Sequence, residues 1–143
     1  MPNMGSSKRE KEKFVRHSGD RDSFSMTEAF SCASCGIKHA FISQRNFKIH
    51  VVFAIIAIIL GFVLQIPQSS WLAVVLCITI VFSLEVLNTA IESLVDMTSP
   101  QWHLLAMHAK DCAAGAVFVS AIGSIVVALI VYIPPFLALF ELA

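Results

Sequence analysis

The chain has 143 residues, of which 57% are hydrophobic and 14% are charged, and its mean hydropathy is +0.77. This composition excludes an ordinary soluble domain and is typical of an integral membrane protein. The formal net charge is zero, but nine of the ten Lys and Arg residues lie within the first 50 positions, which indicates that the two ends of the chain meet different environments.

Residues 1–23 are polar and densely charged, and they lack the short apolar core of a signal peptide. We expect this segment to be a disordered cytoplasmic tail. Its basic residues are diluted by Glu10, Glu12, Asp20 and Asp22, so we expect no nucleic acid partner.

An amphipathic helix is predicted over residues 24–43. Its apolar residues recur at spacings of three and four, and they are Met26, Phe30, Ala33, Ile37 and Phe41. This pattern is typical of a helix that lies on the membrane surface, although Gly36 disfavours helix formation.

The four cysteines form no disulfide framework, and we expect them to be reduced. Cys32 and Cys35, together with His39, raise the possibility of a zinc site on the predicted surface helix. A structural zinc site needs a fourth ligand, which the sequence does not offer. We therefore favour small, buried thiols at these two positions.

Three membrane-spanning helices are predicted, over about residues 48–66, 71–97 and 110–133. Each contains an apolar stretch close to the length of roughly 20 residues that a span requires. The "PQSS" segment turns the chain between the first two helices, and Trp71 is an interfacial residue type. We therefore expect an all-α membrane protein.

Helix-boundary residues flank the helix that contains the third predicted span. Ser99 can cap the start of this helix and Pro100 can occupy its first position, whereas Pro134 and Pro135 are expected to end it. The basic residues ahead of the first span place the amino terminus in the cytoplasm, because positive flanks stay inside.

The second span carries a polar stripe. Glu85, Asn88, Glu92 and Asp96 are spaced by three, four and four residues and therefore share one side of a helix. Carboxylates at membrane depth are costly and usually mark function. The alternative is an interhelical contact that only stabilises the bundle, but such contacts usually rely on Ser, Thr, Asn or Gln.

The charged residues have the chemistry of phosphoryl transfer. Counted from the start of the span, Glu85 lies about 21 Å into an apolar core roughly 30 Å thick, where it resists ionisation and suits a general base. Glu92, nearer the cytoplasm, offers hard oxygen ligands for Mg²⁺. Lys110 can pair with a phosphate. A base, a metal and a cation are the parts that phosphoryl transfer needs.

A rival hypothesis is an ion or proton pathway lined by Glu85 and Glu92. Such a pathway would continue polar residues toward the outer face, where residues 71–84 offer only Thr79 and Ser83. A third interpretation, a structural membrane subunit, predicts no dependence on ATP.

Four segments resemble the bacterial diacylglycerol kinases, and more closely their undecaprenol kinase branch. They are "RNFKIH" (45–50), "EVLNTAIESLVD" (85–96), "SPQWH" (99–103) and "AKDCAAGAV" (109–117). They fall in the family's order, and the resemblance covers about residues 24–133. It implies a lipid kinase domain over residues 24–143.

The resemblance further implies a multi-pass homotrimer in the bacterial cytoplasmic (inner) membrane, with a cytoplasmic amino terminus. Each subunit would have three spans and a surface helix. It would use ATP with Mg²⁺ to phosphorylate a lipid alcohol at the cytoplasmic face, with undecaprenol favoured and diacylglycerol as the alternative.

The resemblance also implies roles for single residues. By position, Glu85 looks like the catalytic base, Glu92 like a metal ligand that also contacts nucleotide, Asn88 and Asp96 like supporting residues, and Gln101, Trp102, His103, Lys110 and Asp111 like nucleotide contacts. Gln44 stands where the family typically has an acid. Its amide oxygen can still coordinate Mg²⁺, but without charge. His50 is expected near a helix end, with no partner identified.

Overall fold

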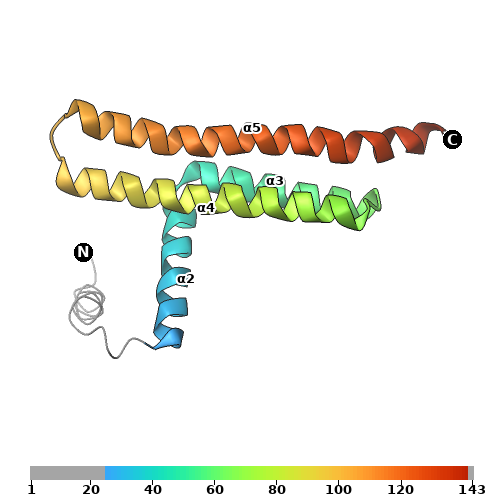
Figure 1. Ribbon diagram of the computed structural model, residues 1–143. Coiled ribbons are helices and arrows are strands. Elements are labelled where there is room, and N and C mark those ends of the chain that lie inside the picture. The colour runs from blue at the N-terminus through green and yellow to red at the C-terminus, as the bar shows by residue number, and fades with distance from the viewer. Residues whose placement is uncertain (1–24, 142–143) are drawn as a thin grey trace. The chain divides into compact units, whose positions relative to one another are not determined.

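The computed structural model describes residues 25–141, so the predicted tail over residues 1–23 lies outside the described residues. Four helices follow one another (Figure 1): α2 (Met26–Ser43), α3 (Arg45–Val63), α4 (Gln68–Thr98) and α5 (Leu104–Glu141). The described part of the chain contains no strand. The predicted all-α class is therefore confirmed.

The chain divides into two compact units, Met1–Ile37 and Lys38–Ala143. In the first unit, a capping box fixes the start of α2. The backbone N–H of Ser25 donates to Oε2 of Glu28 at 3.1 Å, and the N–H of Glu28 donates to Oγ of Ser25 at 3.3 Å. This reciprocal pair satisfies N–H groups that the first turn of a helix leaves without partners.

The side chains of α2 in the first unit are largely exposed. Met26, Phe30 and Ile37 each present an apolar side chain to the surface. Cys32 and Cys35 are also exposed, so the expectation of buried thiols is wrong for the single chain, because α2 has no neighbour over these positions within its unit. The location of α2 on a membrane surface stays a prediction.

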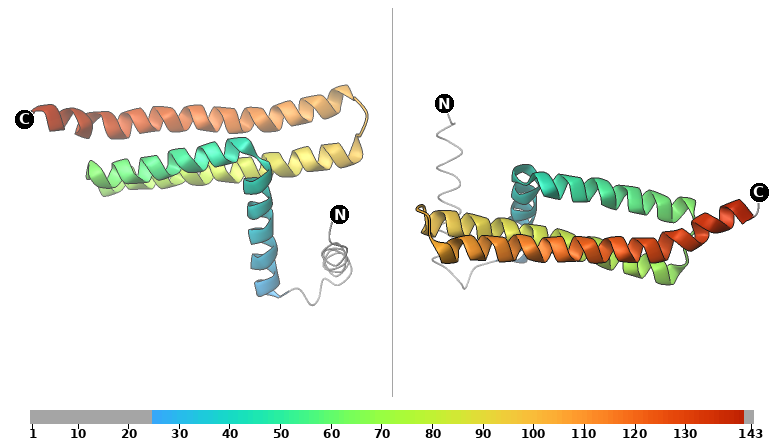
Figure 2. Two further views of the ribbon diagram at one scale, coloured as in Figure 1. Left: turned by 180° about the vertical axis from the view of Figure 1, so that it is seen from behind. Right: turned by 90° about the horizontal axis from the view of Figure 1, so that it is seen from above.

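The second unit is built on α3, α4 and α5, which run side by side in both views (Figure 2). By length and composition, all three are able to cross a membrane: Arg45–Val63, Gln68–Thr98 and Leu104–Leu139. Three helices able to span a membrane are therefore present, as predicted, while the exact extent of each span stays a prediction. Only 6% of the apolar window of α5 is buried, so lipid or another protein surface must cover the rest of it.

The turn between α3 and α4 is tightly packed. The ring centroids of Phe62 and Trp71 lie 4.8 Å apart, and the backbone N–H of Ile66 donates to the carbonyl oxygen of Gly61 at 3.1 Å. A Cβ atom on Gly61 would lie 2.7 Å from the ring of Trp71, which is closer than van der Waals contact allows. Glycine at this position therefore lets α4 approach α3.

A small apolar cluster holds the helices together at this end. Ile66, Val74 and Val131 are buried, and partly buried apolar side chains of all three helices pack around them. The hydroxyl of Tyr132 in α5 donates to the carbonyl oxygen of Ala57 in α3 at 2.8 Å. The three helices therefore form one bundle, with its apolar core away from the polar stripe.

The predicted start of the helix that contains the third span, at Ser99 and Pro100, is wrong. The backbone N–H of Ser99 donates to the carbonyl oxygen of Val95 at 2.8 Å, so this residue ends α4 and does not start the next helix. The following helix begins at Leu104, where Nδ1 of His103 accepts a 3.2 Å hydrogen bond from the backbone N–H of Leu105. The imidazole thus supplies the acceptor that a helix start requires.

The predicted end of the third span is also wrong, because α5 continues through Pro134 and Pro135. A proline removes one amide donor, but its φ angle is compatible with a helix, and polar groups nearby often compensate in apolar helices. Figure 2 shows the last turns of α5 bending away from the line of the preceding ones. The prolines therefore bend the helix without ending it.

Candidate functional site

The polar stripe of α4 passes from the protein interior to its surface. Glu85, Asn88 and Thr89 are buried, with exposed fractions of 2%, 8% and 5%. Glu92 is partly buried and Asp96 is exposed. The spacing in the sequence therefore places these side chains on one side of α4 as expected, and each successive turn brings them closer to solvent.

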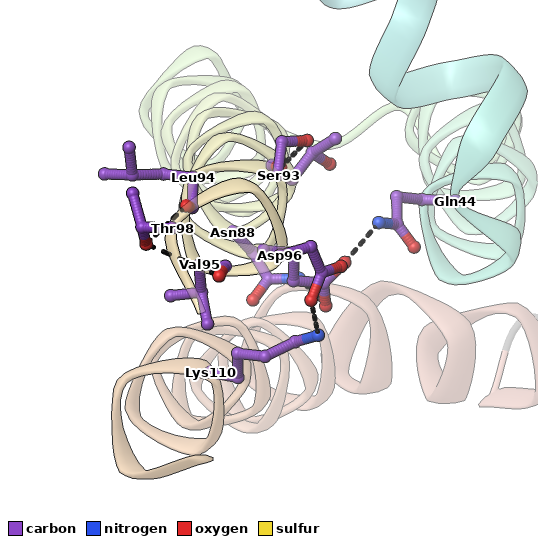
Figure 3. A network of polar contacts seen from close by, with 10 residues as sticks. Gln44, Asn88, Ser93, Leu94, Val95, Asp96, Thr98 and Lys110 are labelled. Carbon is purple, nitrogen blue, oxygen red and sulfur yellow. Dashed lines mark hydrogen bonds and ion pairs between the residues drawn. The ribbon is translucent and has the colours of Figure 1, made fainter. Parts of the chain in front are cut away.

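Two amide groups hold the carboxylate of Glu92. Nε2 of Gln44, the residue before α3, donates to Oε2 at 2.6 Å, and Nδ2 of Asn88 donates to Oε1 at 3.0 Å. Figure 3 shows the Gln44 side chain reaching toward α4 from the neighbouring helix. Both carboxylate oxygens are thus oriented, and each keeps a lone pair for a further partner.

An ion pair joins α4 to α5 next to this group. Nζ of Lys110 lies 2.8 Å from Oδ1 of Asp96, and both side chains are accessible to solvent. Figure 3 shows the Lys110 side chain extended toward α4. An exposed pair contributes about 0–1 kcal/mol of stability, so its main effect is to position the ammonium group. Asp111 is exposed.

The buried acid Glu85 faces a histidine of α3. Nε2 of His50 lies 3.3 Å from Oε1 of Glu85, and the two side chains are 23% and 3% exposed. Among the described residues, this oxygen has no hydrogen-bond partner, so the contact is of ion-pair length without hydrogen-bond geometry. The backbone oxygen of Glu85 accepts from Oγ1 of Thr89 at 2.9 Å.

Sequence reasoning missed the contact of His50 with Glu85. The pattern that would have found it becomes visible only in the structure, where the buried residues of α3, Phe47, Ala54 and Gly61, recur every seven positions. His50 follows Phe47 by three positions and therefore shares the side of the helix that faces α4. The remaining residues of α3 are apolar on nearly every side, which hides this periodicity.

Three predicted nucleotide contacts lie in the connection between α4 and α5. Gln101, Trp102 and His103 are all exposed, and Trp102 is 79% exposed. No hydrogen bond or ion pair among the described residues joins these side chains to Glu92 or Lys110. Their contact with ATP stays a prediction.

The oxygen atoms around Glu92 fit a magnesium ion that keeps other ligands. Oδ1 of Asn88 is buried without a hydrogen-bond partner among the described residues, but the same amide presents Nδ2 to the carboxylate, so Oδ1 could join a metal at Glu92 only if the amide turned over. The described residues hold no group of three or more His, Cys, Asp or Glu side chains that could bind a metal. Mg²⁺ commonly binds to one or two carboxylates and completes its shell with water and phosphate.

Gln44 presents its nitrogen to Glu92, and not its carbonyl oxygen. In this orientation the amide is a hydrogen-bond donor that holds the carboxylate. Its predicted role as a metal ligand would require the amide to turn over, and it stays a prediction.

A largely apolar cavity of about 360 Å³ lies among α3, α4 and α5. His50 lines this cavity together with apolar side chains such as Phe53, Val81 and Phe82. A pocket with mostly apolar walls and a few polar groups is typical of a site for a ligand with a hydrocarbon part. The buried acid therefore lies close to a space of suitable chemistry for a lipid.

Comparison with known proteins gives consistent similarities. A family model described as prokaryotic diacylglycerol kinase matches residues 31–132. A diacylglycerol kinase of Synechocystis is 41% identical over 112 residues, which is 78% of this chain and 64% of that protein. An undecaprenol kinase of Bacillus subtilis is 40% identical over 107 residues, 75% of this chain and 87% of that protein. The similarity thus spans just under two thirds of the Synechocystis protein and most of the Bacillus protein.

Proposed function

This chain belongs to the prokaryotic diacylglycerol kinase family, and from that premise we propose that it transfers the γ-phosphoryl group of ATP to undecaprenol. The family and the names of its relatives make it an ATP-dependent lipid kinase. The choice of undecaprenol as acceptor is supported by the similarity to an undecaprenol kinase, which covers 87% of that protein. Diacylglycerol is the second candidate, because the Synechocystis relative is a diacylglycerol kinase of nearly equal identity.

One observation carries the proposal for the site. Three charged groups occur together along α4 and its neighbouring helices. They are the buried acid Glu85, the second acid Glu92, which two amides hold, and the ammonium group of Lys110. These are the groups that phosphoryl transfer to an alcohol uses: a base, a metal ligand and a cation.

Glu85 is the proposed general base. Its carboxylate is almost fully buried, and no side chain among the described residues donates a hydrogen bond to it, so it has capacity to accept a proton even if one oxygen is held by a neighbour. The lipid hydroxyl would donate this proton to Glu85 while its oxygen attacks the γ-phosphorus, and the bond from that phosphorus to the bridging oxygen would break to release ADP. The apolar surroundings exclude water, which would otherwise compete as the acceptor of the phosphoryl group.

Glu92 is the residue that would hold Mg²⁺, which neutralises charge on the phosphates of ATP when it is bound, and Asn88 supports the carboxylate of Glu92 through the 3.0 Å hydrogen bond. Gln44 keeps the Glu92 carboxylate in place through the 2.6 Å hydrogen bond. Because a hard cation needs its oxygen ligands in fixed positions, this contact would favour binding even without direct ligation by Gln44.

Lys110 is the proposed partner of the transferred phosphate. Asp96 holds its ammonium group at 2.8 Å, and both side chains are exposed, so the cation is accessible to a nucleotide from solvent. We further propose that the nucleotide is lined by Gln101, Trp102 and His103, which are exposed in the connection before α5, and by Asp111, which is exposed in α5 next to Lys110.

We also propose a homotrimer in the bacterial inner membrane with its amino terminus in the cytoplasm. The large exposed apolar surface of α5 supports further helix packing, and the basic residues ahead of α3 support this orientation. The exposed apolar side chains of α2 suit a helix on the membrane surface.

The direct test is phosphorylation by the full chain, purified in detergent, with labelled ATP, Mg²⁺ and each lipid in turn. We expect labelled undecaprenyl phosphate at a higher kcat/KM than labelled phosphatidic acid from diacylglycerol. A higher kcat/KM with diacylglycerol would show that diacylglycerol, and not undecaprenol, is the preferred acceptor. No labelled lipid from either substrate, combined with ion flux in vesicles, would favour the rival pathway.

A further inference from the structure

We propose that His50 is a positioning residue for Glu85, in that its imidazole orients the carboxylate so that one oxygen faces the lipid hydroxyl. The inference rests on the proposed function, with Glu85 as the base. It starts from the 3.3 Å contact between Nε2 of His50 and Oε1 of Glu85, which joins α3 to α4.

A buried carboxylate oxygen without a hydrogen bond is destabilising, because it has lost its contacts with water and gained none in the protein. Oε1 of Glu85 is such an atom among the described residues, and His50 places a ring nitrogen within ion-pair distance of it. A small rotation of the imidazole or the carboxylate about its last side-chain bond would turn this contact into a hydrogen bond. His50 is therefore in position to fix the orientation of the carboxylate.

The two helices that carry His50 and Glu85 are packed together close to this pair. The rings of Phe47 in α3 and Phe82 in α4 make an edge-to-face contact with centroids 5.1 Å apart. Each of these residues lies three positions before one member of the His50 and Glu85 pair, so the aromatic contact and the polar contact are neighbours. The aromatic pair fixes α3 against α4 where His50 faces Glu85.

The contacts of His50 are separate from those of the proposed nucleotide and metal groups. The hydrogen bonds of Glu92 go to Gln44 and Asn88, and Lys110 pairs with Asp96. His50 instead borders the apolar cavity. A change at His50 should therefore alter the geometry of the base and lower kcat, while the KM for ATP with Mg²⁺ stays nearly constant.

Three substitutions separate positioning from simple packing. His50→Gln keeps an N–H donor at nearly the reach of Nε2, His50→Asn places its amide too far back, and His50→Leu removes every donor. We expect kcat to fall about 10- to 100-fold for His50→Leu and His50→Asn, as is typical when the support of a reacting group is lost. His50→Gln should recover most of that loss.

Ile49→Ala is the matched control, because it truncates an exposed neighbour in the same helix. All variants are compared by size-exclusion profile and thermal unfolding in detergent, so that a loss of assembly is detected. A kcat for assembled His50→Leu equal to that of the wild-type protein would overturn the proposal. Equal losses in His50→Gln and His50→Leu, or a raised KM for ATP at constant kcat, would also contradict it.

The wild-type protein and Glu85→Gln are measured in the same assay. If the wild-type protein does not phosphorylate lipid, the proposed function fails. If the wild-type protein is active and Glu85→Gln is equally active, the assignment of Glu85 as base fails. If the wild-type protein is active, Glu85→Gln is inactive and assembled His50→Leu is fully active, only the positioning role of His50 is contradicted.

Discussion

The side-chain amide of Gln44 donates a 2.6 Å hydrogen bond to Glu92, a residue 48 positions later in the chain. This contact places the residue before α3 beside the proposed metal ligand of α4. An uncharged residue is suited to this position, because its amide N–H stabilises the neighbouring carboxylate directly, whereas an acid there would repel Glu92 unless a cation lay between them.

Gln44→Glu should lower the Mg²⁺ concentration required for half-maximal activity, on the order of tenfold, because it adds a second charged oxygen next to Glu92. The two carboxylates would repel each other without the metal, so thermal stability should come to depend on Mg²⁺. A titration of Mg²⁺ at saturating ATP and lipid measures the first effect. An unchanged Mg²⁺ curve in an assembled variant would place Gln44 away from the metal.

Glu92→Ala should slow phosphorylation by about 100-fold and raise the Mg²⁺ requirement, because it removes the charged ligand and leaves the amides of Gln44 and Asn88 without their acceptor. Initial rates over a range of Mg²⁺ concentrations check both effects. Ser93→Ala is the control, because this hydroxyl lies in the next position and, among the described residues, donates its one hydrogen bond to the backbone oxygen of Thr89. Unaltered Mg²⁺ dependence in Glu92→Ala would indicate a different ligand.

Glu85→Gln should reduce turnover by about 100-fold or more while the oligomer still assembles, because an amide of nearly the same shape keeps the packing but cannot accept the proton. Single-turnover phosphorylation and the size-exclusion profile in detergent test the two parts. Ser83→Ala, an exposed change on the same helix, should behave like the wild-type protein. Full activity in Glu85→Gln would contradict a role as base.

Gly61→Ala should lower the free energy of unfolding by about 1–3 kcal/mol, because the added Cβ would lie 2.7 Å from the ring of Trp71, which also contacts Phe62. Thermal unfolding in detergent measures the change. Gly36→Ala provides the comparison, since a Cβ there meets no atom within 4 Å. Equal stability of the two variants would show that the α3 and α4 turn adjusts without loss.

A cysteine introduced at Ser69 should react with an impermeant thiol reagent from outside the cell, and one at Gln101 only from inside, after the native cysteines have been replaced. Both positions are exposed, at the start of α4 and in the connection before α5. The expectation follows from the basic residues that precede α3. The opposite labelling pattern would place Glu92 and Lys110 away from cytoplasmic ATP and contradict the kinase mechanism.

The sequence alone determined the helical class, the number of helices able to span a membrane, and the polar stripe of α4. These features depend on residues close together in the chain. A continuous apolar stretch sets the length of a span, and spacings of three and four set which side chains share one side of a helix. Glu85, Asn88 and Glu92 could therefore be placed together without any knowledge of the neighbouring helices.

The helix boundaries required more than local patterns. Ser99 and Pro100 have the properties of a helix start, yet the imidazole of His103 takes that role. Pro134 has the properties of a helix end, yet α5 continues through it. In both places the local sequence allows the helix to begin or end at more than one residue. The packing of the connection and of α5 decides which residue is used.

The partners of the polar groups were decided only by the tertiary structure. Three polar contacts each join two different segments of the fold: Gln44 with Glu92, Lys110 with Asp96, and His50 with Glu85. Such contacts depend on how each helix is rotated about its own axis. In α3, apolar residues surround the helix almost completely, so its pattern leaves that rotation open. The rotation follows from close packing, where Gly61 admits Trp71 and Phe47 meets Phe82, and this packing turns His50 toward the buried acid.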